Sequence, residues 1–116
     1  MREQDPGRGI RVYRPETSLT TENARELVEL IRPGDQESAP MVVVDMSRLR
    51  SMDSTGVGVL VSARKLTRLL RGNLVLANTA PDMRRLLILM DVHRMIDIYD
   101  SVASASRELL HGLQEA

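Results

Sequence analysis

Cysteine, tryptophan and phenylalanine are absent from this chain of 116 residues, and tyrosine occurs only twice. Without cysteine the protein has no disulfides, no thiolate metal ligands and no thiol nucleophile. The absence is also consistent with a reducing compartment. The scarcity of aromatic rings predicts an aliphatic core, and it removes the stacking platforms on which single-stranded nucleic acids bind.

The chain has no excess of either charge, because sixteen basic residues balance sixteen acidic ones. A neutral chain lacks the positive field typical of proteins that bind DNA or RNA, so we expect no nucleic-acid partner. The first nine residues contain no apolar stretch of the kind found in signal peptides. No apolar run approaches the ~20 residues of a membrane span. These patterns predict a cytoplasmic protein.

The chain has the length of one domain and an ordinary hydrophobic fraction of 42%. Residues 1–9 are polar and contain two glycines and a proline, so we expect a flexible tail followed by a single domain over residues 10–116. Short β-branched runs predict strands at residues 10–13, 41–44, 74–77 and 95–99. Apolar residues at helical spacing predict helices that begin near residues 20, 54, 81 and 101.

The predicted strands and helices alternate along the chain. Short connections between alternating elements imply right-handed crossovers and a mostly parallel sheet. The predicted fold class is therefore α/β: a mostly parallel four-stranded sheet, to which an extra N-terminal strand can be added, with about four helices packed on it. Functional sites of such folds lie in loops at the carboxyl ends of strands. The most unusual of these loops spans residues 45–53 and leads into the longest helix.

Ser54 lies at the expected start of that helix. Either its hydroxyl or the carboxylate of Asp53 can serve as the N-cap, which accepts a hydrogen bond from a free N–H of the first turn. A functional interpretation is also open, in which the Ser54 hydroxyl is exposed and receives a phosphate of about −1.5 to −2 charges. A helix N-terminus tolerates an anion, so the fold survives. A partner packed on the neutral hydroxyl is then repelled, and the charge of Asp53 adds to the repulsion.

Two glycines follow in the first turns of the same helix. Gly56 and Gly58 each cost ~1 kcal/mol relative to alanine at a helical position, so their small size needs a reason. One explanation is close packing of the helix start against the sheet. The other is close approach by the backbone of a partner. The residue types leave both explanations open.

The segment Met-Asp-Ser-Thr-Gly-Val-Gly-Val-Leu at residues 52–60, behind the strand and loop at 42–47, resembles the signature of STAS-domain anti-sigma factor antagonists. The resemblance continues through residues 72–77 and 81–87 and covers roughly residues 40–113. It implies that an anti-sigma factor with serine-kinase activity phosphorylates Ser54. It also implies that the unphosphorylated form binds this partner and frees a sigma factor. By the same resemblance, the phosphorylated form releases this partner, and a PP2C-type phosphatase removes the phosphate.

The same resemblance places Asp53 beside the phosphoacceptor. We expect the partner-binding surface to comprise Met52, Asp53, Thr55, Gly56, Val57 and Gly58. The N-terminal third departs from the family pattern, which usually has two strands and a Gly-x-Leu-Asp-like element before the first helix. Here one clear strand precedes residues 14–20, which contain neither glycine nor aspartate. In the family this region belongs to the partner surface.

Two other functions are open. A constitutive STAS scaffold, as a subunit of a transport or signalling complex, is consistent with the unusual N-terminal third. A small-ligand or nucleotide-binding domain is the other, but its motifs are incomplete. The pair Gly56 and Gly58 lacks the third glycine of a dinucleotide fingerprint, because residue 61 is valine. Neither a P-loop nor a nucleophile elbow occurs in the sequence.

Metal and catalytic groups also find little support. His93 and His111 have no metal-ligand partner at a useful spacing, and we expect both on the surface. Asp45 and Asp53 flank the long loop, and a magnesium ion between them is an alternative to a metal-free site. We predict a protein that is not an enzyme and has no cofactor and no metal. The basic residues of the longest helix form either a solvated face or a patch for an acidic partner protein: Arg64, Lys65, Arg68 and Arg71.

Overall fold

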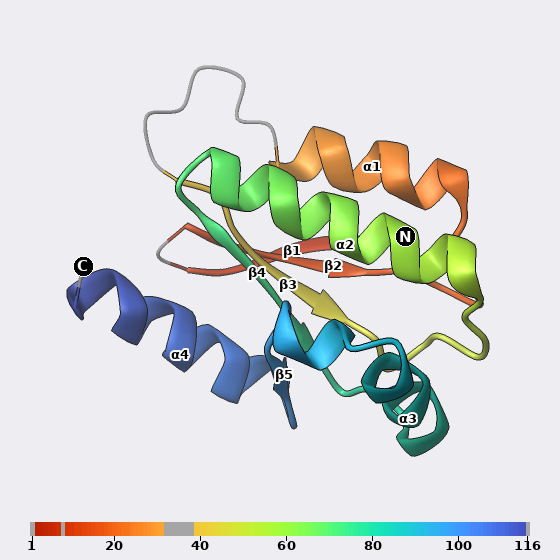
Figure 1. The fold of residues 1–116 in the computed structure, drawn as a ribbon. Helices are drawn as coiled ribbons and strands as arrows, with labels where there is room; N and C mark the ends of the chain where they lie inside the picture. The colour runs from red at the N-terminus through yellow and green to blue at the C-terminus, as the bar shows by residue number, and fades with distance from the viewer. Residues whose placement is uncertain (1, 8, 32–38, 116) are drawn as a thin grey trace.

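The computed structural model describes residues 2–7, 9–31 and 39–115 (Figure 1). Within these residues, strands alternate with helices after an N-terminal pair of strands. The elements are β1 (Arg2–Gly7), β2 (Ile10–Arg14), α1 (Thr21–Ile31), β3 (Met41–Asp45), α2 (Ser54–Leu69), β4 (Asn73–Ala77), α3 (Pro81–Leu89), the 3-10 helix η1 (Val92–Arg94), β5 (Ile98–Tyr99) and α4 (Val102–Glu115).

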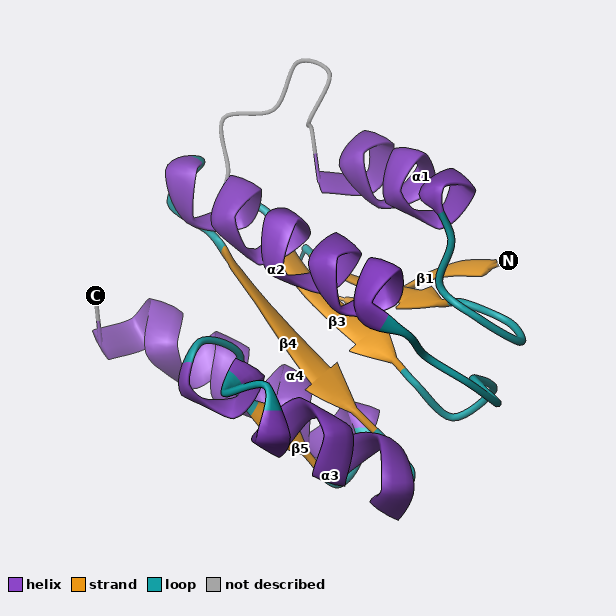
Figure 2. Ribbon diagram, turned by 45° about the vertical axis from the view of Figure 1, so that its right-hand side comes forward, coloured by secondary structure: helices purple, strands orange, loops and turns teal. Residues whose placement is uncertain are grey.

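The five strands form one sheet in the order β1-β2-β3-β4-β5. Strands β2 to β5 are parallel to one another, and β1 is antiparallel to β2. Helices α1, α2 and α3 cover one face of the sheet, and α4 covers the other (Figures 1 and 2). The prediction of an α/β domain with a mostly parallel sheet and four helices is confirmed.

The N-terminal segment differs from the prediction. A flexible tail was expected over residues 1–9, but Arg2–Gly7 form β1 and pair with β2. Gly9 has φ of +79°, a conformation that glycine adopts without steric cost and that reverses the chain between the two strands. The strand is polar and contains a proline because it lies at the edge of the sheet, where both are tolerated. Residues 1 and 8 of the expected tail lie outside the described residues.

Apolar side chains of the strands alternate between two core layers, as the two-residue repeat of a strand requires. The layer under α1, α2 and α3 takes Tyr13, Val42, Val44, Leu74 and Leu76. The layer under α4 takes Ile10, Val12, Met41, Val43, Val75 and Ala77. Both faces are buried, which explains why β3 and β4 are continuous apolar runs.

Tyr13 joins the sheet to α1. Its buried hydroxyl donates to Oε1 of Glu26 at 2.9 Å and accepts from Nδ2 of Asn23 at 2.8 Å. Asn23 also accepts from the backbone N–H of Thr20 at 2.8 Å, and the hydroxyl of Thr20 accepts from the N–H of Asn23 at 3.3 Å. Thr20 therefore caps α1, at the position near which the sequence predicts that a helix begins.

The last strand is shorter than the predicted 95–99. Val92–Arg94 form a 3-10 turn, β5 contains only Ile98–Tyr99, and the side chain of Met95 is 41% exposed. The buried residues of this region are Val92 and Ile96, and the N–H of Ile96 donates to Val92 O at 2.9 Å, so a helical turn and not an extended strand joins them. Among the described helices, none combines the length with the apolar character needed to cross a membrane.

Helix α2 ends at Leu69, with Leu70 as its C-cap. The N–H of Arg71 donates to Arg68 O at 3.0 Å and that of Gly72 to Thr67 O at 2.7 Å, so Arg71, with φ of +67°, holds the left-handed position. Gly72 is needed for another reason: a Cβ there would overlap the carbonyl oxygen of Pro40.

Candidate functional site

The loop that leads into α2 is held by the loop between β2 and α1. The N–H of Thr17 donates to Arg48 O at 3.2 Å, and the carbonyl of Thr17 accepts from the N–H groups of Arg50 at 2.8 Å and Ser51 at 3.2 Å. Thr17 and Leu49 also form an isolated parallel bridge. Figure 2 shows the two loops side by side at the end of the sheet where α2 begins. The start of α2 is therefore fixed by residues far away in the sequence.

Asp53 is the N-cap of α2. Its backbone is extended, with φ −115° and ψ −169°, and its Oδ1 accepts a hydrogen bond from the N–H of Gly56 at 3.1 Å. Ser54 is the first helical residue, its side chain is exposed, and it makes no side-chain hydrogen bond to the described part of the chain. Of the two capping residues considered, Asp53 takes the role, and the hydroxyl of Ser54 is accessible.

The six residues expected at the partner surface differ in how exposed they are. Thr55 and Gly58 are exposed, as is Asp53, and Met52 is half-buried. Gly56 and Val57 are buried in the chain itself, so they do not form part of its exposed surface, and their role in partner binding stays a prediction. A helix turns 100° per residue, which directs positions 56 and 57 toward the core. They support the exposed residues from beneath.

The two helical glycines have different surroundings. A Cβ at Gly56 would lie 2.9 Å from Cγ of Met52 and 3.0 Å from Cβ of Leu19, so close packing explains this glycine. A Cβ at Gly58 would meet no atom within 4 Å. The internal packing of the chain therefore does not require glycine at position 58.

A buried carboxylate lies at the carboxyl end of β3. Asp45 is 2% exposed, and its oxygens accept from Nε of Arg14 at 2.8 Å, from Nδ2 of Asn78 at 3.1 Å and from the N–H of Ser47 at 3.0 Å. Burial acts to raise the pKa of Asp45, but these hydrogen bonds outweigh it and hold the pKa below its ordinary value. The cluster ties together the ends of three neighbouring strands.

Sequence reasoning missed this cluster, although its signal was present. Arg14, Asp45 and Asn78 each stand at the end of a parallel strand, and such ends meet at one edge of the sheet. The magnesium alternative paired Asp45 with Asp53, but Arg14 is the charged partner of Asp45 and Asp53 caps α2. The described residues contain no group of three or more acidic or histidine side chains arranged to hold a metal ion.

The basic residues of α2 lie toward the opposite end of the helix. Lys65, Arg68 and Arg71 are exposed, and Arg68 donates to the carbonyl of Gly72 at 3.4 Å. Burial, together with the nearby charge of Arg68, lowers the pKa of Arg64. Positive charge near a helix C-terminus offsets the negative end of the helix dipole. The basic residues nearest the C-terminus of α2 therefore contribute to ending the helix.

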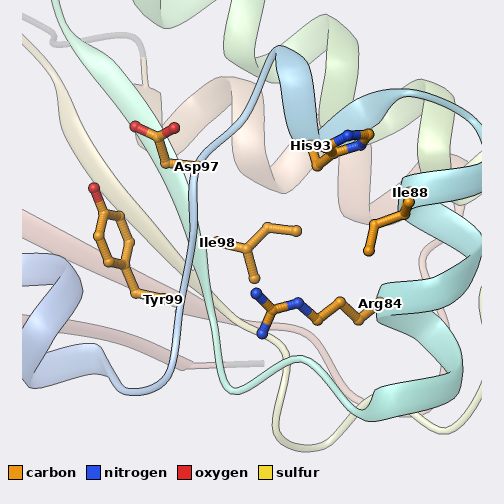
Figure 3. A pocket seen from close by; sticks show the side chains of 6 residues that line it. All are labelled: Arg84, Ile88, His93, Asp97, Ile98 and Tyr99. Carbon is orange, nitrogen blue, oxygen red and sulfur yellow. The ribbon is translucent and has the colours of Figure 1, made fainter.

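The surface of the described residues includes the following two cavities. One, of about 570 Å³, lies between the two joined loops and is lined by Glu16, Thr17, Ser47, Arg48, Leu49 and Arg50. The other, of about 360 Å³, lies beside β5 and is lined by Arg84, Ile88, His93, Asp97, Ile98 and Tyr99. Figure 3 shows Arg84 reaching from α3 toward Ile98. Of these two cavities, the first adjoins the start of α2.

His93 and His111 are exposed, as predicted.

Comparisons with known proteins agree with this architecture. The model of the STAS domain family matches residues 4–105. An anti-sigma F factor antagonist of Paenibacillus polymyxa is 31% identical over 68 residues, which are 59% of this chain and 58% of the relative. The chain thus spans less than two thirds of the length of the curated relative that it matches.

Solved structures show the same fold. A proposed anti-sigma factor antagonist of Thermotoga maritima superposes with a TM-score of 0.77 at 23% identity, over 93% of this chain and 92% of the other. The STAS domain of a SulP transporter from Vibrio cholerae has a TM-score of 0.78 at 14% identity, over 97% and 89%. The Bacillus cell fate determinant SpoIIAA in its phosphorylated form has a TM-score of 0.65 at 19% identity, over 91% and 96%.

Proposed function

The chain belongs to the STAS domain family, and we propose that it is an anti-sigma factor antagonist switched by phosphorylation of Ser54. Its partner is an anti-sigma factor with serine-kinase activity, which it sequesters while Ser54 is unmodified. A PP2C-type phosphatase removes the phosphate and restores binding. The observation that carries the proposal is the exposed hydroxyl of Ser54 at the first position of α2, left free because Asp53 provides the cap.

The helix start can accept the phosphate without unfolding. The N–H groups of Ser54 and Thr55 precede the first intrahelical hydrogen bond, which the N–H of Val57 donates to Asp53 O at 3.0 Å. Such free N–H groups and the positive end of the helix dipole favour an anion. The kinase transfers the γ-phosphoryl group of ATP to Oγ of Ser54, and the hydroxyl proton leaves to a base of the kinase.

The exposed residues around Ser54 form the proposed docking surface, which comprises Asp53, Thr55 and Gly58, with Met52 at its margin. Gly58 has no side chain, so a partner can approach the helix backbone closely at this position. The binding gained in this way offsets the ~1 kcal/mol that glycine costs in helix stability. A phosphate on Ser54 adds about two negative charges beside the carboxylate of Asp53, so this small-residue surface becomes strongly negative. A partner packed on it is therefore released.

This role needs no catalytic group in the chain itself, because the kinase and the phosphatase supply the chemistry. It also places the protein in the cytoplasm, where sigma factors and ATP are found.

Mass spectrometry tests the proposal. Incubation with the cognate anti-sigma factor and Mg-ATP is expected to raise the intact mass by one phosphate group. Ser54→Ala removes the acceptor and abolishes the increase, whereas the matched variant Thr55→Ala retains it. Wild-type protein that neither binds nor gains mass with its cognate anti-sigma factor would contradict the proposal.

A constitutive scaffold in a transport or signalling complex is the second candidate. Residues 14–20 favour it, because they lack the family's usual Gly-x-Leu-Asp-like element at the partner surface. Affinity capture with Ser54→Ala and Ser54→Asp separates the two functions. A scaffold retains the same partners with both variants, whereas a switch retains the anti-sigma factor with Ser54→Ala alone.

A further inference from the structure

The larger cavity, between the β2–α1 and β3–α2 loops, is a polar cleft that phosphorylation of Ser54 does not itself use. Three charged side chains line it: Glu16, Arg48 and Arg50. Because the loop that carries Arg48 and Arg50 continues directly into α2, the cleft and Ser54 lie at the same end of the sheet (Figures 1 and 2). A partner that covers Ser54 is therefore in a position to reach the cleft.

The charges of the cleft do not cancel. Nη1 of Arg48 pairs with Oε1 of Glu16 at 3.1 Å, with both side chains more than half exposed. Arg50 is exposed and forms no ion pair with the described residues. The lining therefore carries one positive charge without an internal partner, and the exposed pair beside it is weak.

The backbone that carries this charge is rigid. The N–H groups of Arg50 and Ser51 donate to Thr17 O at 2.8 and 3.2 Å, and Arg48 O accepts from the N–H of Thr17 at 3.2 Å. Thr17 itself has φ of +67°, a costly conformation for a β-branched residue, which the surrounding hydrogen bonds maintain. A side chain held on a fixed backbone loses less freedom when it binds than one on a mobile loop.

We propose that this cleft receives an acidic side chain of the partner protein, with Arg50 as its ion-pair partner. The inference rests on the proposed function and adds the charge of the surface that the antagonist recognises. A guanidinium binds a carboxylate through two parallel hydrogen bonds, which gives direction as well as attraction. The only acidic residue at 14–20 is Glu16, and it already pairs with Arg48. The cleft thus favours a partner with negative charge here and disfavours one with positive charge.

The same partner carboxylate makes the switch steeper. Arg50 and Ser54 are four positions apart in the chain, so their Cα atoms lie within ~14 Å of each other. That upper bound exceeds the screening length of ~8–10 Å at physiological salt, so the two positions influence each other's ligands most at low salt. Under those conditions a phosphate on Ser54 repels the carboxylate that Arg50 attracts, in addition to blocking the surface around Ser54.

Binding of the full-length chain to its cognate anti-sigma factor, measured at several salt concentrations, tests the inference. Arg50→Glu is expected to weaken binding roughly tenfold or more, mainly through slower association at low salt. Arg50→Gln, which removes the charge without reversing it, is expected to fall between Arg50→Glu and wild type. Arg85→Glu is the matched control, because it makes the same charge change at an exposed position of α3. We expect it to bind like wild type.

The outcomes separate the inference from the function on which it rests. If wild type binds and is phosphorylated but Arg50→Glu binds equally well, the cleft has no such role and the proposed function stands. If Arg85→Glu weakens binding as much as Arg50→Glu, the effect is one of net charge and the inference is overturned. If wild type neither binds nor is phosphorylated, both fail. Restoration of Arg50→Glu binding by an acidic-to-lysine change in the partner would identify the paired carboxylate.

Discussion

The carboxylate of Asp53 accepts a hydrogen bond from the N–H of Gly56 at 3.1 Å. This contact assigns the two neighbouring polar residues at the start of α2 to different roles. Asp53 stabilises the helix, and Ser54 is left with an exposed hydroxyl that no internal contact requires. A residue that structure does not need is free to serve as a modification site.

Removal of the cap tests the role of Asp53. Asp53→Ala is expected to lower the free energy of unfolding by ~1 kcal/mol, because the N–H of Gly56 loses its acceptor. Asp53→Asn retains an acceptor oxygen and should stay close to wild type. Urea denaturation followed by circular dichroism measures both. Equal stability of the alanine variant and wild type would mean that the cap contributes nothing.

Substitution of Gly58 is expected to change stability and partner binding in opposite directions. Gly58→Ala is expected to raise stability by up to ~1 kcal/mol, because alanine favours the helix and its methyl group meets no atom of this chain. If the proposed docking surface is used, the same methyl group should weaken binding of the anti-sigma factor, because it fills the space above the backbone at position 58. Gly112→Ala in α4 is the control, since its Cβ also meets nothing within 4 Å. We expect it to leave binding unchanged. Undiminished binding by Gly58→Ala would remove position 58 from the docking surface.

The end of α2 offers a pair of opposite predictions. Gly72→Ala is expected to destabilise the fold by ~1–3 kcal/mol, because the added methyl group overlaps the carbonyl of Pro40. Arg71→Gly is expected to stabilise it by up to ~1 kcal/mol, because φ at this position is +67° and glycine adopts that angle freely. Thermal unfolding distinguishes the two. A stable Gly72→Ala protein would show that the strand after α2 can shift away from Pro40.

Asp45 makes stability depend on pH at the acidic end. Its folded pKa lies below the ordinary value of 3.8, so the unfolded chain binds this proton more readily. The stabilisation is therefore fully present above pH ~4 and is lost as the pH falls through the lower folded pKa. Denaturation of wild type and Asp45→Asn across this range is the measurement. The variant should be less stable at neutral pH and should show a shallower decline in acid. Parallel curves would show that Asp45 does not contribute.

Much of the fold was predictable because its signals are local. The apolar runs at 41–44 and 74–77 and the helical periodicity between them identify the parallel core without any long-range information. The fold prediction allowed an extra N-terminal strand, but the residues of β1 were expected in a tail, because an edge strand with a proline has no alternating apolar pattern. β5 was predicted too long because a short apolar run does not distinguish a turn from a strand. Val92 and Ile96 are buried, but a 3-10 turn and not a strand places them in the core.

By itself, the sequence determined the alternation of strands and helices, the aliphatic core and the position of Ser54 at a helix start, since periodicity and turn residues act over a few positions. Only the tertiary structure decided that Asp53 is the N-cap of α2 and that Arg14 pairs with Asp45 across 31 positions of the chain. It also decided that Gly56 is closely packed, whereas a Cβ at Gly58 would contact no other atom. These outcomes depend on which distant segments become neighbours, and on the direction in which each helix turn faces. That geometry is set when the sheet assembles.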